Sequence, residues 1–120
     1  MKETKSTNPE IIQLIRFLKK QGNENEAKIW REVAKYLAKT KQNRTAVNLS
    51  RINRYTQKSD VVVVPGKILG SGAIDHAVTV AALNASEKAK TKLAAVKAKY
   101  VSIPELVKTN PKGSNVKIIR

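Results

Sequence analysis

The chain has 120 residues, which suits one domain with a modest hydrophobic core. Its 24 Lys and Arg residues outnumber its 9 Asp and Glu residues, and the formal net charge is +15. Self-repulsion of that size opposes compaction, so we expect a polyanionic partner, either nucleic acid or an anionic membrane. No apolar run approaches the roughly 20 residues that span a bilayer, and the N-terminus lacks the apolar stretch of a signal peptide. We therefore expect no membrane partner and a cytoplasmic location.

The residue types present argue against catalysis and against a bound cofactor. The sequence has no Cys, and His76 is its only His, so thiolate chemistry is excluded and a metal site lacks ligands. The Gly-rich nucleotide fingerprints GxGxxG and GxxxxGK[ST] are absent. Most of the acids stand beside basic residues at helical spacing, which is typical of ion-pair partners rather than of a general acid–base pair. We expect no enzyme, no cofactor, no metal and no small-molecule substrate.

Residues 1–44 predict a basic arm of two helices. The first helix begins at an Asn cap, Asn8, which Pro and Glu follow, and we expect it to end at Gly22. The second helix spans about residues 25–39, with apolar side chains on one side and a basic stripe opposite. Such a stripe is either merely solvated or in contact with phosphate, and the basic character of the whole chain favours phosphate. The stripe is Lys28, Arg31, Lys35 and Lys39, and Lys41 and Arg44 follow it in the linker.

Residues 45–120 predict a mixed α/β module that ends in a basic tail. Pro65 has no backbone N–H, so its strand is expected either to lie at a sheet edge or to bend there. Ser50 and Ser86 are expected to cap the two helices of the module. The expected strands are 46–49, 61–69, 78–82 and 101–103, and the expected helices are 50–56, 86–100 and a final turn at 104–110.

Several polar side chains of the module are expected to contact RNA. Arg51 and Arg54 are three residues apart and share a helix face, and the planar guanidinium suits phosphate better than an ammonium does. The loop of residues 70–72 either cradles a phosphate or is a plain turn, and His76 is either a polar loop residue or an RNA contact. Four of the five aromatics, including Tyr55 of the short helical turn, are assigned to apolar faces, so core packing is expected and folded RNA is favoured over a single strand. The RNA-binding residues predicted in the module and tail are Asn48, Arg51, Arg54, Lys67, Ser71, His76, Lys112 and Arg120.

Two stretches of the sequence resemble one family. The first carries Lys35, Leu37, Lys41, Arg44, Val47, Asn48, Leu49, Arg51 and Ile52, and the second runs from Lys67-Ile68-Leu69-Gly70-Ser71-Gly72 to Ala89 and Leu93. The first resembles the signature of archaeal and eukaryotic large-subunit ribosomal proteins of the L-eighteen-e type. The second resembles the signature shared with the bacterial L-fifteen proteins. Thr40 and Thr45 depart from the first pattern, and Lys97 stands near where the family usually has Gly.

The resemblance covers nearly the whole chain and implies both a fold and a role. The implied fold is an irregular β-β-α superhelical module preceded by two helices, without enzymatic activity. The implied partners are large-subunit rRNA and neighbouring large-subunit ribosomal proteins, in translation. Two alternative functions come from other classes of protein: a free-standing RNA or DNA regulator, and an enzyme that acts on RNA. The first needs a recognisable reader motif and the second a catalytic cluster, and neither is evident in the sequence.

The ligand inventory makes a prediction about metals. We expect the purified, RNA-free chain to carry no stoichiometric transition metal, because one His and no Cys cannot complete a tetrahedral site. Elemental analysis by mass spectrometry measures this directly. One zinc per chain would contradict the prediction, whereas Mg²⁺ held by phosphates of bound RNA would not.

Overall fold

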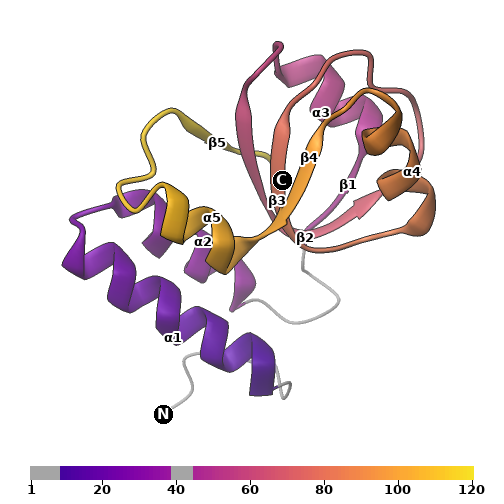
Figure 1. Cartoon of the computed structure of the whole chain (residues 1–120). Helices are drawn as coiled ribbons and strands as arrows, with labels where there is room; N and C mark the ends of the chain where they lie inside the picture. Colours follow the sequence, from indigo (N-terminus) through magenta and orange to yellow (C-terminus); the bar gives the residue numbers. More distant parts are fainter. Residues whose placement is uncertain (1–8, 39–44) are drawn as a thin grey trace. The chain divides into compact units, whose positions relative to one another are not determined.

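The computed structural model describes residues 9–38 and 45–120, and the predicted RNA contacts Lys39, Lys41 and Arg44 lie outside that part (Figure 1). The chain divides into two compact units. The first unit comprises residues 1–44 and 104–114, and the second comprises residues 45–103 and 115–120. No helix within the described ranges is long and apolar enough to cross a membrane.

Three helices build the first unit. They are α1 (Pro9–Glu24), α2 (Lys28–Leu37) and, apart from its first residue, α5 (Ile103–Thr109). The Trp30 side chain is fully buried, and its indole Nε1 donates a hydrogen bond to the backbone oxygen of Pro111 at 2.7 Å. This bond ties α2 to the segment that follows α5 and satisfies the polar atom of a buried aromatic ring. The two predicted N-terminal helices are therefore present.

Gly22 does not end α1, so the predicted stop is wrong. The helix continues to Glu24, and the left-handed turn falls on Glu26, with φ 53°. A Cβ at Gly22 would lie 2.7 Å from Cγ of Arg31 on α2. The glycine therefore permits close approach of α1 and α2, and α2 begins at Lys28, later than predicted.

The second unit is a parallel sheet of five strands. The order is β1-β2-β3-β4, and β5 also pairs with β2. β1 lies along the second half of β2, where Thr45 pairs with Gly66, and β5 lies along its first half, where Val61 pairs with Val116. The mixed α/β class with two leading helices is thus confirmed, while the superhelical description stays a prediction. The strands are β1 (Thr45–Asn48), β2 (Val61–Leu69), β3 (Thr79–Ala85), β4 (Lys99–Ser102) and β5 (Val116–Ile118).

Pro65 lies within a strand that has neighbours on both sides, so the edge alternative is wrong. The structure shows the other alternative, an irregularity at the proline. The register between β2 and β3 shifts between Val64 and Lys67, which brackets Pro65. The missing N–H therefore falls where the ladder is already interrupted, and no regular hydrogen bond is lost.

One hydrophobic core joins the sheet to α3 (Leu49–Tyr55) and α4 (Glu87–Ala95). It combines side chains of both helices with side chains of β1, β2 and β3, and it also takes in one residue of the tail, Ile119. The tail is therefore anchored in the core. The buried members are Val47, Leu49, Ile52, Val62, Val64, Ile68, Ile74, Val78, Val80, Ala82, Ala85, Ala89, Leu93 and Ile119.

Only one of the two predicted serine caps is present. The Ser86 Oγ accepts a hydrogen bond from the Ala89 amide at 3.1 Å and caps α4. α3 begins one residue earlier than predicted, so Asn48 and not Ser50 occupies its N-cap position. The Asn48 side chain makes no capping hydrogen bond and is exposed.

α4 ends at Ala95, earlier than the predicted Tyr100. Lys97 adopts a left-handed conformation with φ 61°, its amide donates to the Ala94 carbonyl at 3.0 Å, and the Ala98 amide donates to the Leu93 carbonyl at 2.9 Å. These two bonds form a Schellman motif, which normally places Gly at the left-handed position. Residues 99–102 then form β4, so Tyr100 lies in a strand and not on the helix.

The left-handed Lys97 leads to a prediction about stability. Replacing Lys97 with Gly should raise the free energy of unfolding by about 0.5–1 kcal/mol, because Gly adopts positive φ without the steric cost of a Cβ. Thermal unfolding followed by circular dichroism should show a melting temperature higher by a few degrees. Lys97→Ala is the matched control, since it removes the same charge but keeps the Cβ. Equal stability of the Gly and Ala variants would contradict the prediction.

Candidate nucleic-acid interface

α3 is held along one side by the loop that follows β2. The Ser50 amide donates to the carbonyl of Ser71 at 3.3 Å, and the Asn53 Oδ1 accepts from the Asp75 amide at 3.1 Å. A Cβ at Gly72, whose φ is +83°, would lie 2.4 Å from the Cβ of Ser50. The loop therefore follows the helix closely and places the exposed Ser71 side chain beside its first turn.

His76 fixes the far end of the same helix. Its Nδ1 lies 2.8 Å from Asp75 Oδ1, and its Nε2 lies 2.7 Å from Thr56 Oγ1. This order of acid, imidazole and hydroxyl occurs in acyl-transfer enzymes. Here Thr56 is buried, and its hydroxyl donates to the Ile52 carbonyl at 2.7 Å. The hydroxyl proton of Thr56 therefore bonds the end of α3 and does not point at His76. The arrangement gives His76 a structural role, and its predicted RNA contact stays a prediction.

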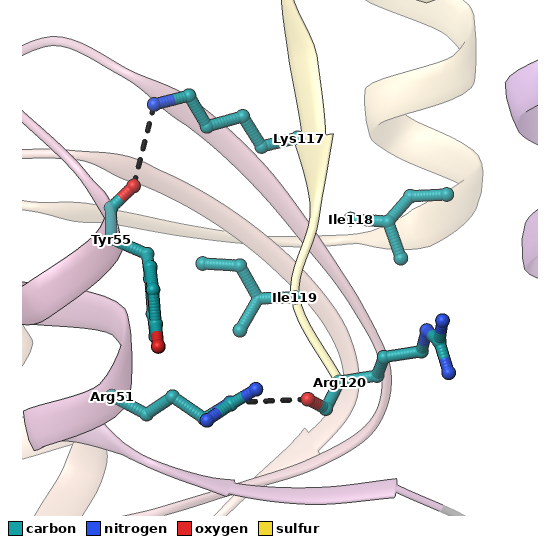
Figure 2. A pocket seen from close by; sticks show the side chains of 6 residues that line it. All are labelled: Arg51, Tyr55, Lys117, Ile118, Ile119 and Arg120. Carbon is teal, nitrogen blue, oxygen red and sulfur yellow. Dashed lines mark hydrogen bonds between the residues drawn. The ribbon is translucent and has the colours of Figure 1, made fainter.

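The tail holds the other side of α3. Lys117 Nζ donates to the Tyr55 carbonyl at 3.3 Å and to Asp60 Oδ2 at 2.9 Å, while Arg51 Nε donates to the backbone oxygen of Arg120 at 3.1 Å. Figure 2 shows the Lys117 side chain reaching from β5 to the end of α3, and the Arg120 side chain extending away from Arg51. These contacts join segments about 60 residues apart in the sequence.

Arg51 and Tyr55 form a stacked pair at the centre of this contact. The guanidinium carbon of Arg51 lies over the Tyr55 ring, 5.2 Å from its centroid. Tyr55 is 51% exposed, so its assignment to an apolar face of the core is wrong. With Lys117, Ile118, Ile119 and Arg120, the pair lines a hollow of about 700 Å³, which we name the α3–β5 groove (Figure 2).

The structure brings six of the predicted RNA-binding residues to α3 or to the segments beside it. Arg54 is exposed and, at about 100° per residue, lies nearly opposite the buried Ile52. Lys67 is exposed on β2. Lys112 belongs to the first unit. The six residues are Asn48, Arg51, Arg54, Ser71, His76 and Arg120.

The ammonium group of Lys92 binds the loop of residues 70–72. Lys92 Nζ donates to the carbonyl oxygens of Gly70 and Gly72 at 2.7 and 2.6 Å. The loop therefore directs two carbonyl oxygens at an ammonium group, and its binding to phosphate through backbone N–H groups stays a prediction. Lys92 was not predicted as a site residue. Only the folded loop, 20 residues away in the sequence, reveals its position.

The first unit carries a second basic surface. Lys28, Arg31 and Lys35 are exposed on α2, opposite its buried apolar side chains. Arg31 Nη1 donates to Asn23 Oδ1 at 3.1 Å, which links α2 to the end of α1. A hollow of about 380 Å³ lies beside this link, and its lining residues are Lys19, Asn23, Arg31, Ala34, Lys35 and Ala38. The amphipathic division of α2 is as predicted, and its contact with RNA stays a prediction.

Residues 1–120 match the family described as "Ribosomal protein 60S L18 and 50S L18e". The chain belongs to this family. It is 52% identical over 114 residues to the large ribosomal subunit protein eL18 of Methanoregula boonei, covering 95% of this chain and 94% of that protein. The protein of the same name from Methanospirillum hungatei is 46% identical over the same shares of the two chains, and that from Methanococcus maripaludis is 47% identical over 99% of each.

Membership in the L18e family confirms two predictions from the sequence. The family resemblance read from residues 35–52 and 67–93 is correct. Members of a ribosomal protein family are structural constituents and not enzymes, so the expectation that the chain lacks catalytic activity also holds.

Two residues of the α3–β5 groove were missed in the sequence. Tyr55 follows Arg51 by four residues, a helical spacing that places both side chains on one face, so a local signal existed. Lys117 had no such signal, because its position depends on pairing between β5 and the distant β2. Its basic character alone did not distinguish it from the other lysines of the tail.

Asp60 couples the groove to pH. The Gln57 amide donates to Asp60 Oδ2 at 2.8 Å and Lys117 Nζ donates to the same oxygen, and these bonds lower the pKa of the carboxyl group. A carboxylate with a lowered pKa stabilises the folded state above its unfolded pKa of about 3.9, and this contribution is lost as the pH falls through the folded value. The attachment of Lys117 should therefore weaken in acid.

We expect Asp60→Asn to destabilise the chain at neutral pH and to lose this effect in acid. Urea unfolding of both proteins from pH 7 down to pH 3 should show their difference in stability shrinking below about pH 4. Lys117→Ala should remove part of the same pH dependence, and the double variant should add little to either single change, because the residues share one interaction. A constant difference at every pH would argue against the coupling.

Proposed function

We propose that this chain is a structural constituent of the large ribosomal subunit, where it binds and stabilises folded large-subunit rRNA through Arg and Lys contacts with phosphates. The names of its relatives support the large subunit as the setting. The net charge of +15 supports an anionic partner, since each neutralised phosphate releases counterions. The subunit would place the chain in the cytoplasm, in contact with neighbouring ribosomal proteins.

The observation that carries the phosphate-binding part of the proposal is the fixed orientation of Arg51. One hydrogen bond and one aromatic contact hold its guanidinium on a helix that is itself held from both sides. Arg54, three residues on, is exposed on the outward side of the same helix. A side chain ordered before binding loses less entropy when it binds, so the Arg51 guanidinium is suited to a specific phosphate contact, and Arg54 adds a second guanidinium on the same short helix.

Mass action explains how such contacts stabilise the RNA. A protein that binds the folded form of an RNA and not the unfolded form shifts the equilibrium toward the folded form. Basic side chains on α2 and α3 are exposed. They would neutralise phosphates where RNA helices approach each other. The groove and the α2 surface could thus contact different parts of one folded RNA.

We expect Arg51→Ala with Arg54→Ala to weaken binding to a large-subunit rRNA fragment much more than Lys90→Ala with Lys97→Ala. Both pairs remove two exposed cations, but Lys90 and Lys97 lie on or beside α4 and carry ammonium groups, which lack the planar array of donors of a guanidinium. Charge-assisted hydrogen bonds contribute about 1.5–3 kcal/mol each, so loss of the arginine pair should lower the affinity by about 100-fold or more. Filter binding at two salt concentrations measures both the affinity and its salt dependence.

A second arginine variant separates charge from geometry. Arg51→Lys with Arg54→Lys keeps both charges but removes the planar forks, so we expect an affinity between that of the wild type and that of the alanine pair. Equal losses for the arginine-to-alanine and lysine-to-alanine pairs, with the same salt slope, would leave only general basic character as an explanation. Cosedimentation with large subunits at high salt tests the ribosomal setting separately.

A further inference from the structure

We propose that the α3–β5 groove binds one unpaired RNA base, stacked on Tyr55, while Arg51 and Lys117 hold the adjoining phosphate. This inference rests on the proposed function and names the feature of the RNA that the groove would recognise. The predicted preference for folded RNA over a single strand assumed that Tyr55 is part of the core. Its exposure at the surface removes that assumption for this part of the molecule.

Tyr55 is the large hydrophobic side chain that stands out as exposed within residues 9–38 and 45–120. Trp30 is fully buried, and Phe17, Tyr36 and Tyr100 are partly buried. An exposed aromatic ring on a basic surface is the usual platform for a base in proteins that bind unpaired nucleotides. The cation over Tyr55 adds to this, because a guanidinium plane also stacks on bases.

The groove combines an apolar wall with a cationic rim. Figure 2 shows the Ile119 side chain pointing toward the Tyr55 ring, with Arg51 along the floor and Lys117 at the opposite end. The apolar parts suit the faces of a base, and the ammonium and guanidinium groups suit its phosphate. The hollow of about 700 Å³ falls within the range of about 300–1,000 Å³ that holds small ligands, a class that includes a nucleotide.

The charges around the groove favour an anionic occupant. Its lining includes the side chains of Arg51, Lys117 and Arg120 and no Asp or Glu side chain. Asp60 lies beside it, but its carboxylate already accepts hydrogen bonds from Lys117 and from the Gln57 amide. A base inside a duplex is stacked on both faces and cannot offer one to Tyr55, so the occupant has to be a bulged or otherwise unpaired nucleotide.

Two RNA hairpins test the proposal, one fully paired and one that differs only by a single unpaired 2-aminopurine in its stem. The wild-type chain should bind the bulged hairpin about tenfold more tightly than the paired one, and the 2-aminopurine fluorescence should fall on binding. Tyr55→Ala should remove both the preference and the quenching. Because Tyr55 also holds the Arg51 guanidinium, the readout is the ratio of the two affinities of the same variant, which a loss shared by both hairpins does not change. Tyr55→Phe should keep both effects, because it keeps the ring.

Tyr55→Leu is the matched control, since it keeps apolar area without a π-face and should behave like the alanine variant. Circular dichroism verifies that each variant is folded, as expected for a substitution at a half-exposed position. Equal binding of both hairpins by the wild type without quenching would overturn the proposal, as would an alanine variant that keeps the preference. If polyglutamate binds the wild type but does not bind Tyr55→Ala, the groove binds an acidic protein and the proposal is overturned.

The same measurements separate this inference from the proposed function. Salt-sensitive binding to the paired hairpin and to large-subunit rRNA, without preference for the bulge, would overturn only the base-binding groove. Absence of binding to all three RNAs would overturn both proposals.

Discussion

The interface around α3 depends on the docking of residues 116–120 beside β2. β5 takes the stretch of the β2 edge that β1 leaves open, and the Ile119 amide then donates to the Val63 carbonyl at 3.1 Å. The Ile119 side chain enters the core, which contributes about 1.5–3 kcal/mol relative to an exposed position. Because the backbone of the tail is fixed in this way, Lys117 meets the end of α3 at Tyr55 and Arg120 meets its first turn at Arg51. The groove is thus a consequence of one long-range pairing.

α3 itself is too short to persist alone. Helices shorter than about 12–15 residues are marginal in water, and α3 has 7. Burial of Leu49 and Ile52, contacts with the loop of residues 70–76 on one side and contacts with the tail on the other supply the stability that the isolated segment lacks. The same contacts order Arg51 and Tyr55 in the free protein. Rigidity at this surface and stability of the fold therefore share the same interactions.

Local patterns in the sequence predicted most of the elements, and the errors fall where distant contacts decide. Caps, prolines and apolar spacing located the helices and four of the strands. The role of Gly22 depends on Arg31 across the α1–α2 contact, and the exposure of Tyr55 depends on where the tail docks. The sequence predicts only a basic tail after residue 110, because the three residues of β5 become a strand only when β2 offers an edge. Lys97 ends α4 without the Gly that would have marked that end in the sequence.

The second unit orients two of its lysines with backbone carbonyl groups. Lys92 donates to the carbonyls of Gly70 and Gly72, and Lys117 donates to the carbonyl of Tyr55. A carboxylate in these places would fix the side chains equally well but would cancel their charge. A carbonyl dipole fixes the geometry and leaves the positive charge available to an anion. Lys117 has Asp60 as a second partner, so its charge is more compensated than that of Lys92, which donates to two carbonyl oxygens.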